Sequence, residues 1–175
     1  MNNSKTHTKK MDAHNISQPQ AYVYMDAKFN EDKTRVSLLR VWNEKLKKCC
    51  VVMNFPSSAD KEKDDMTIRR TVQILNFNGF GSLFVVNVGV SNFQEKIKDA
   101  LISDLNTTVV IAWGNHLTRK DNINEIKKLR KMIEEIDCSS EILCFGININ
   151  GTPKLPTMLS TKTMLRVYEL YELYE

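Results

Sequence analysis

Short apolar blocks alternate along this chain with longer segments in which apolar residues recur every three or four positions. The blocks are rich in valine, isoleucine and leucine, which is typical of strands. Strands are expected at residues 21–29, 36–42, 48–53, 83–90, 107–112 and 141–147. The longer segments between them have a helical period, as at Ile68, Val72 and Leu75. This alternation of strands and helices predicts an α/β fold.

The order of the elements predicts how the sheet is built. The first two strands are joined by a charged turn at residues 30–33 and predict a β-hairpin. Helices separate the four later strands, and right-handed crossovers make such strands parallel. We therefore expect a three-layer α/β/α fold with a four-stranded parallel sheet, helices on both faces, and an amino-terminal β-hairpin.

The two ends of the chain differ in character. Residues 1–20 are polar and mildly basic, so we expect a flexible tail followed by one domain over residues 21–175. Near the other end, Ser160 or Thr161 precedes a segment rich in tyrosine and leucine, which predicts a last helix. Its apolar residues are Leu165, Tyr168, Leu170, Tyr171, Leu173 and Tyr174. Such a helix is either buried or part of an interface with a partner.

Composition narrows the class of protein. The chain has 175 residues and a net charge of +4, which permits contact with nucleic acid without requiring it. Its four cysteines, Cys49, Cys50, Cys138 and Cys144, include no Cys-x-x-Cys pair. No apolar run is long enough to span a membrane. We therefore expect a cytoplasmic protein with buried cysteines and with no metal, no cofactor and no membrane anchor.

Unusual residues stand at the carboxyl ends of three predicted strands. The strand at 48–53 runs into Phe55, Pro56 and Ser57, and the strand at 83–90 contains Asn87. The strand at 107–112 is followed by Trp113, Gly114 and Asn115. Ligands of open α/β sheets bind in the crevice outside the carboxyl ends of the strands. The sequence therefore predicts a shared site at this edge.

The same segments resemble two related families. Residues 56–60, 65–70, 87 and 112–115 are similar to the motifs of an uncharacterised bacterial and phage domain family, over residues 36–156. The layout also resembles the uracil-DNA glycosylase superfamily. In those enzymes one strand ends in an Asp-Pro or Asn-Pro motif that orients the attacking water, and a later strand ends in an asparagine that reads the base edge. A final His-Pro dipeptide stabilises the departing base.

Residue by residue, the resemblance is retained at one functional position of the family and lost at two others. Asn87 falls on the base-reading asparagine, and an amide carries both a donor and an acceptor for the edge of a flipped base. Phe55 falls on the water-orienting position and Leu155 on the leaving-group position, where neither side chain can act. Asn54 cannot simply replace Phe55, because successive strand residues point to opposite faces. The resemblance implies a catalytically lapsed relative with a uracil-DNA glycosylase-like fold and no catalytic residue.

We therefore expect this protein to act by binding. The resemblance implies two partners: DNA, bound weakly, or a protein that mimics DNA and inhibits uracil-DNA glycosylases. One alternative is a hydrolase or glycosylase acting on an unusual nucleobase or nucleotide, and another is an interaction module without a pocket function. The expected pocket residues are Phe55, Pro56, Ser57, Asn87, Trp113, Asn115, Leu155 and Pro156.

Several of these residues also have a plainer interpretation. Asn87 is a potential helix cap and Trp113 a potential core residue, while Ser57 is suited to cap the next helix. Arg69 and Arg70 either contact phosphate or pair with the acidic residues just before them. The two interpretations differ in the contacts that each side chain should make in the folded protein.

Overall fold

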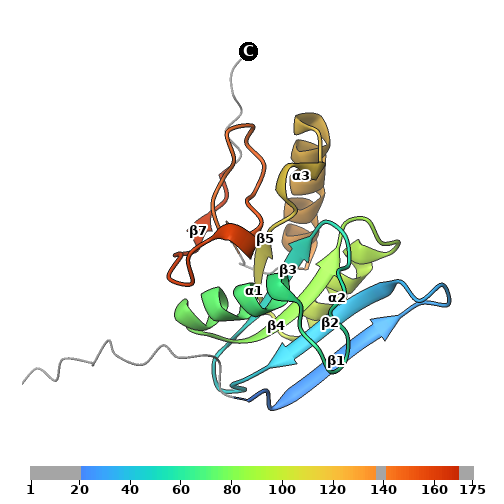
Figure 1. The fold of residues 1–175 in the computed structure, drawn as a ribbon. Helices are drawn as coiled ribbons and strands as arrows, with labels where there is room; N and C mark the ends of the chain where they lie inside the picture. Colours follow the sequence, from blue (N-terminus) through green and yellow to red (C-terminus); the bar gives the residue numbers. More distant parts are fainter. Residues whose placement is uncertain (1–20, 137–140, 170–175) are drawn as a thin grey trace, which may run out of the picture.

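The computed structural model describes residues 21–136 and 141–169, and within them seven strands form one sheet (Figure 1). The predicted tail at residues 1–20 lies outside the described residues. The strands are β1 (Tyr24–Phe29), β2 (Arg35–Val41), β3 (Lys47–Met53), β4 (Phe80–Asn87), β5 (Thr108–Ile111), β6 (Ile142–Cys144) and β7 (Arg166–Val167). The helices are α1 (Met66–Phe77), α2 (Phe93–Ser103) and α3 (Arg119–Glu135), with short 3-10 turns η1 (Gly114–His116) and η2 (Pro156–Met158).

The sheet is mixed, in the order β1-β2-β4-β3-β5-β6-β7. The central strands β4, β3, β5 and β6 are parallel to one another, whereas the pairs β1–β2, β2–β4 and β6–β7 are antiparallel. The predicted α/β class is confirmed, but the sheet has seven strands and not four. The hairpin is not a separate addition, because Leu38 of β2 pairs with Val85 of β4 and continues the same sheet.

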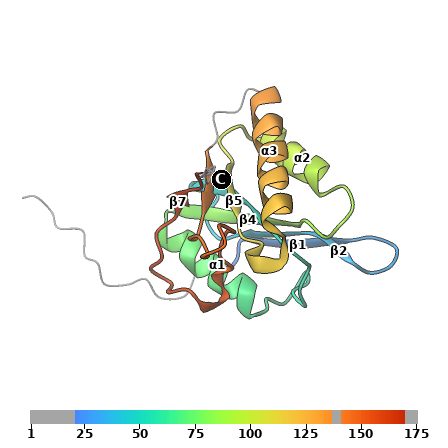
Figure 2. The same cartoon turned by 90° about the horizontal axis from the view of Figure 1, so that it is seen from above.

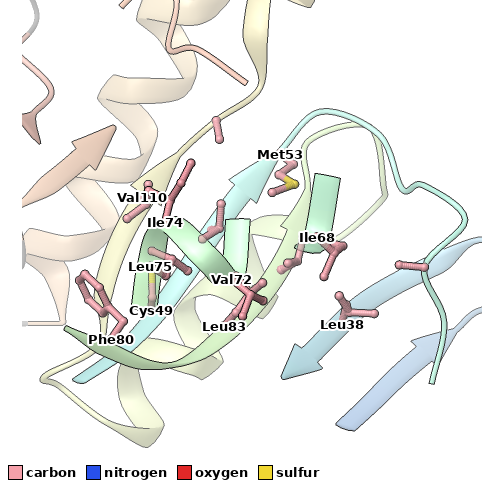
Figure 3. Close-up of a cluster of buried hydrophobic side chains, with 14 of the residues drawn as sticks. Leu38, Cys49, Met53, Ile68, Val72, Ile74, Leu75, Phe80, Leu83 and Val110 are labelled. Carbon is pink, nitrogen blue, oxygen red and sulfur yellow. The ribbon is translucent and has the colours of Figure 1, made fainter. Parts of the chain in front are cut away.

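Helices cover both faces of the sheet (Figure 2). Helix α1 packs on the face that carries Cys49 and Val51, and this cluster is drawn in Figure 3. Helices α2 and α3 pack on the opposite face, against Cys50 and Val52. Alternate residues of β3 thus contribute to two separate cores, as expected for a strand that is buried on both sides.

The predicted last helix is wrong for the residues that the structure describes. The chain instead forms the two-residue strand β7, and the Tyr168 amide donates to the Ile142 carbonyl at 2.8 Å. Tyr168 is buried, and its hydroxyl donates to the Gly151 carbonyl. Pairing with the edge of β6 and these tertiary hydrogen bonds override the local helical pattern. Tyr171 and Tyr174 lie outside the described residues.

Candidate functional site

The carboxyl ends of the parallel strands meet at one edge of the sheet. In the register of β3 and β4, Met53 lies opposite Asn87, and the Ala112 amide beyond β5 donates to the Val52 carbonyl at 2.8 Å. The segments that follow β3, β4, β5 and β6 therefore leave the sheet side by side. Seven of the eight residues that the sequence predicts for the site lie in the segments after β3, β5 and β6, and the eighth, Asn87, is the last residue of β4.

Asn87 is the last residue of β4, and its side chain is 0% exposed. Both polar atoms of this amide, Oδ1 and Nδ2, lack a hydrogen-bond partner among the described residues. Asn87 does not act as a helix cap, because the N-cap residue of α2 is Asn92. Buried polar groups are almost always paired with protein or with ordered water, so the unpaired amide of Asn87 is an unusual feature of this edge.

Phe55 does not enter the site from β3. The strand ends at Met53, and Phe55 is 65% exposed. Its ring lies against the backbone after β4, because a Cβ atom on Gly89 would be only 2.2 Å from the Phe55 Cε1 atom. Asn54, in contrast, is 7% exposed. β3 ends before both residues, and the buried one is Asn54, two positions before Pro56.

Leu155 closes the other side of this edge. A Cβ atom on Gly114 would lie 2.9 Å from Leu155 Cδ1, so Leu155 contacts the segment after β5. Gly114 has a φ of +70°, and its amide donates to the Pro153 carbonyl at 2.9 Å. Pro156 is buried and begins η2, which reaches the start of α1 through the hydroxyl groups of Thr157 and Thr67, 3.2 Å apart. The structure thus joins the end of β5, η2 and α1.

Trp113 and Asn115 already use their polar groups within the protein. Trp113 is fully buried on the face of α3, and its indole Nε1 donates to Asn122 Oδ1 at 2.8 Å. Asn115 Oδ1 accepts a hydrogen bond from the Thr152 hydroxyl at 2.6 Å. Trp113 is therefore a core residue, and Asn115 fixes the loop after β6.

Ser57 belongs to the cap of α1. Its hydroxyl is hydrogen bonded to the carboxylate of Asp65, the N-cap residue, which also accepts from the Ile68 amide at 2.9 Å. Burial alone would raise the pKa of Asp65, but these hydrogen bonds, a further one from the Ala59 amide and the charge of Arg35 lower it overall. The capping interpretation of Ser57 accounts for its contacts.

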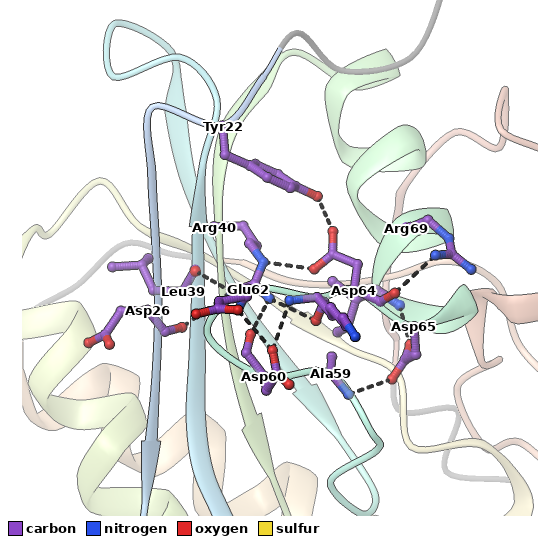
Figure 4. A network of polar contacts seen from close by, with 12 residues as sticks. Tyr22, Asp26, Leu39, Arg40, Ala59, Asp60, Glu62, Asp64, Asp65 and Arg69 are labelled. Carbon is purple, nitrogen blue, oxygen red and sulfur yellow. Dashed lines mark hydrogen bonds and ion pairs between the residues drawn. The ribbon is translucent and has the colours of Figure 1, made fainter.

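A buried arginine holds the β3–α1 loop against the sheet (Figure 4). Arg40 of β2 is 0% exposed, and its Nε atom pairs with Asp64 Oδ1 at 2.7 Å. Its guanidinium group also donates to the carbonyls of Asp26, Leu39, Asp60 and Lys63. The Tyr22 hydroxyl donates to Asp64, and burial followed by this contact raises the pKa of Tyr22.

Arg35 adds a second contact of the same kind, because its Nη1 atom donates to the Ala59 carbonyl at 2.7 Å. Sequence reasoning misses both arginines, since arginine in a strand normally indicates a solvent-facing position. The available signal was the concentration of acidic residues at 60–65, where four of six residues are aspartate or glutamate and can pair with cations elsewhere in the fold. Arg69 does pair with this segment, through a hydrogen bond from Nη1 to the Asp64 carbonyl at 3.0 Å.

Large apolar side chains project from the loops of the same edge. They are Phe55, Met66 at the start of α1, Met158 in η2, and Ile149 between β6 and η2. Ile149 is 110% exposed and stands in a turn closed by the Gly151 amide and the Asn148 carbonyl, 2.9 Å apart. Apolar and aromatic residues displayed in this way are enriched at protein interfaces.

The described residues contain no group of three or more histidine, cysteine or acidic side chains that could hold a metal ion. None of the helices in this part of the chain is both long and apolar enough to cross a membrane.

Residues 35–101 match a family described as "Protein of unknown function (DUF1643)". This finding supports the resemblance to an uncharacterised domain family, over β2, β3, α1, β4 and most of α2. The matched range contains Phe55, Pro56, Ser57 and Asn87 and ends before Trp113 and Leu155. Neither the curated proteins nor the solved structures include a match to this chain.

Proposed function

We propose that this chain is a uracil-DNA glycosylase-like protein without glycosylase activity, and that it acts by binding through the carboxyl edge of its sheet. The observation that carries the proposal is the unpaired, fully buried amide of Asn87 at the end of β4. One donor and one acceptor side by side complement the edge of a nucleobase or of a backbone amide. A ligand that pairs with this amide removes the cost of the unpaired group, which is about 1–3 kcal/mol.

The residues at the two expected chemical positions support the absence of catalysis. Phe55 faces solvent and Leu155 packs against Gly114, and neither side chain carries a group that can transfer a proton. Loss of such a group typically lowers an enzyme's rate by about 100-fold or more. The edge therefore keeps Asn87 as a recognition group, but with Phe55 and Leu155 at the two chemical positions it lacks the groups for hydrolysis.

Two kinds of partner fit this edge: DNA and a protein that mimics DNA. A net charge of +4 favours only weak association with nucleic acid. The exposed side chains of Phe55, Met66 and Met158 favour the protein partner, since aromatic residues and methionine commonly anchor protein interfaces. The preferred partner is therefore a small acidic protein of the kind that inhibits uracil-DNA glycosylases.

One observation supports a second candidate, a hydrolase or glycosylase acting on an unusual nucleobase. Asn54 is buried beside the strand end, where it is a possible replacement for the water-orienting group that Phe55 lacks. An amide can orient a water molecule although it cannot accept its proton at neutral pH. In that case Asn54 and Asn87 would act on the same base.

The test combines a binding and a cleavage experiment. Calorimetric titration with a DNA-mimicking glycosylase inhibitor should give saturable binding that Phe55→Ser weakens about tenfold, which corresponds to about 1.4 kcal/mol at an interface anchor. Phe29→Ser is the matched control, because Phe29 is an exposed phenylalanine on β1. No binding at micromolar concentrations of an inhibitor that is active on a true glycosylase would end the protein-partner proposal.

The cleavage experiment separates the two candidates. We expect no excision of uracil from DNA above a control without protein. Excision that both Asn54→Ala and Asn87→Ala abolish would replace the binding proposal with the enzymatic one. Binding to DNA should be weak and should fall steeply with salt. If neither DNA nor the inhibitor binds, the third reading, an interaction module without a pocket function, remains.

A further inference from the structure

A cavity lies away from the strand ends discussed above, beside the β1–β2 hairpin. It has a volume of about 550 Å³ and opens between α2 and the β1–β2 hairpin, on the face of the sheet that carries α2 and α3. Its floor consists of Leu39, Val41 and Phe84, all half-buried, and Ala100 of α2 forms one side. Leu39 lies directly opposite Phe84 in the register of β2 and β4. Cavities of 300–1,000 Å³ with a mainly apolar lining are typical of small-molecule sites.

This cavity is an open groove, and backbone hydrogen bonds fix one of its walls. The segment after β2 contributes Asn43, Glu44 and Leu46, and the amides of Trp42 and Asn43 both donate to the Gly81 carbonyl, at 2.9 and 3.0 Å. The contact is so close that a Cβ atom on Gly81 would lie 1.8 Å from the Asn43 carbonyl oxygen. A glycine is therefore required here, and the groove is already formed without a ligand.

Charged side chains at the rim give the groove its chemical preference. Three lysines line it, Lys28 of β1, Lys48 of β3 and Lys96 of α2, against two acids, Glu44 and Asp99. Lys48 pairs with Asp104 at 3.0 Å, and Lys96 approaches Asp99 only to 3.9 Å. Lys28 makes no ion pair with any described residue. The rim therefore offers ammonium groups to an anion above an apolar floor.

We propose that this groove binds a small amphiphilic anion, a medium-chain acyl carboxylate, with the acyl chain on Leu39, Val41 and Phe84 and the carboxylate at Lys28 and Lys96. The groove follows β2 from Ser37 to Val41, four residue steps or about 13 Å in an antiparallel strand. An extended chain can lie along this floor. This site is independent of the edge that contains Asn87.

Calorimetric titration of the full chain with decanoate, and separately with decanol, tests the proposal. We expect saturable binding of one decanoate. Lys28→Gln should weaken decanoate binding several-fold and leave decanol binding unchanged. Leu39→Ser should weaken the binding of both probes about tenfold, equivalent to the burial of about two methylene groups. Lys120→Gln is the control, because Lys120 is an exposed lysine on α3 and does not line the groove.

Three results would overturn the proposal. These are the absence of saturable decanoate binding at millimolar concentration, binding that Lys28→Gln leaves intact, and equal affinity for decanoate and decanol. If Leu39→Ser fails to fold, the exposed Lys28→Gln variant decides the question by itself. Asn87→Ala should leave decanoate binding unchanged, so failure of this proposal does not affect the proposed function, and the reverse also holds.

Discussion

Replacement of Asn87 by leucine should not destabilise the free protein, although Asn87 is completely buried. Leucine has nearly the shape of asparagine and no polar atoms. The substitution removes two unpaired polar atoms from the interior, and an unpaired buried group costs about 1–3 kcal/mol. A difference in shape at a packed site costs less than about 1.5 kcal/mol. We therefore expect Asn87→Leu to change the free energy of unfolding by between zero and about 2 kcal/mol, in the stabilising direction.

Asn122 provides the matched control. It is also buried, but its amide accepts from Trp113 Nε1 at 2.8 Å and donates to the Tyr168 hydroxyl at 2.9 Å. Asn122→Leu leaves the indole N–H of Trp113 unpaired, which costs about 1–3 kcal/mol for that group alone. The Tyr168 hydroxyl keeps its hydrogen bond to Gly151. The two substitutions are therefore alike in size and chemistry, and they should change the free energy of unfolding in opposite directions.

Urea unfolding at neutral pH, followed by tryptophan fluorescence, gives both free energies from the midpoints and slopes. The expected difference between the variants is about 1–5 kcal/mol, the sum of the gain expected for Asn87→Leu and the loss expected for Asn122→Leu. Each kcal/mol also moves the melting temperature of a chain of this size by about 2–4 °C. A loss of stability in Asn87→Leu equal to that in Asn122→Leu would refute the reasoning. It would mean that a permanent partner, such as a buried water, already satisfies Asn87.

Two further predictions concern the loops of the same edge. The lowered pKa of Asp65 makes its ionised form stabilising at neutral pH, so the free energy of unfolding should decline as pH falls through and below the ordinary aspartate pKa of 3.8. The Asp65→Asn variant should be less stable than the unsubstituted protein at pH 7 and should lose less stability on acidification. An acid-unfolding profile that Asp65→Asn leaves unchanged would contradict this. Gly114→Ala should lower the free energy of unfolding by about 1–3 kcal/mol, because Gly114 has a positive φ and a Cβ atom there would meet Leu155. Gly79→Ala should cost less, because the φ of Gly79 is also positive but its surroundings are open. Equal losses of stability in thermal unfolding would show that the Leu155 contact has no effect.

The parallel part of the fold could be predicted because its strands are apolar on both faces and helices lie between them. β3, β4 and β5 have this pattern, and adjacent residues such as Cys49 and Cys50 enter opposite cores as expected. β7 could not be predicted, because two residues carry no period. Its position depends on the free edge of β6 and on the hydrogen bonds of Tyr168, which are tertiary contacts.

The sequence predicted that Asn87 lies at the carboxyl end of a strand, and Asn87 is the last residue of β4. Its lack of a hydrogen-bond partner among the described residues is a property of the packed interior and cannot be read from the sequence. The expectation that Asn54 and Phe55 point in opposite directions assumed a strand that continues to Phe55; β3 ends at Met53, and the two residues differ in burial, with Asn54 buried and Phe55 exposed. Trp113 was included in the site because it follows a strand, and its hydrogen bond to Asn122 shows that it serves the core.

The hairpin has a larger role than an edge addition, because its strand β2 contributes to both proposed sites. Arg40 faces α1 and holds the β3–α1 loop through Asp64, while the adjacent Leu39 faces the opposite side and forms the floor of the groove. A slip of one residue would exchange these faces and place a guanidinium group on the apolar floor. The pairing of Leu39 with Phe84 therefore sets the geometry of the loop at one site and of the cavity at the other. A chain without residues 21–41 would lose both Arg40, which holds the β3–α1 loop, and Leu39, which forms the floor of the groove.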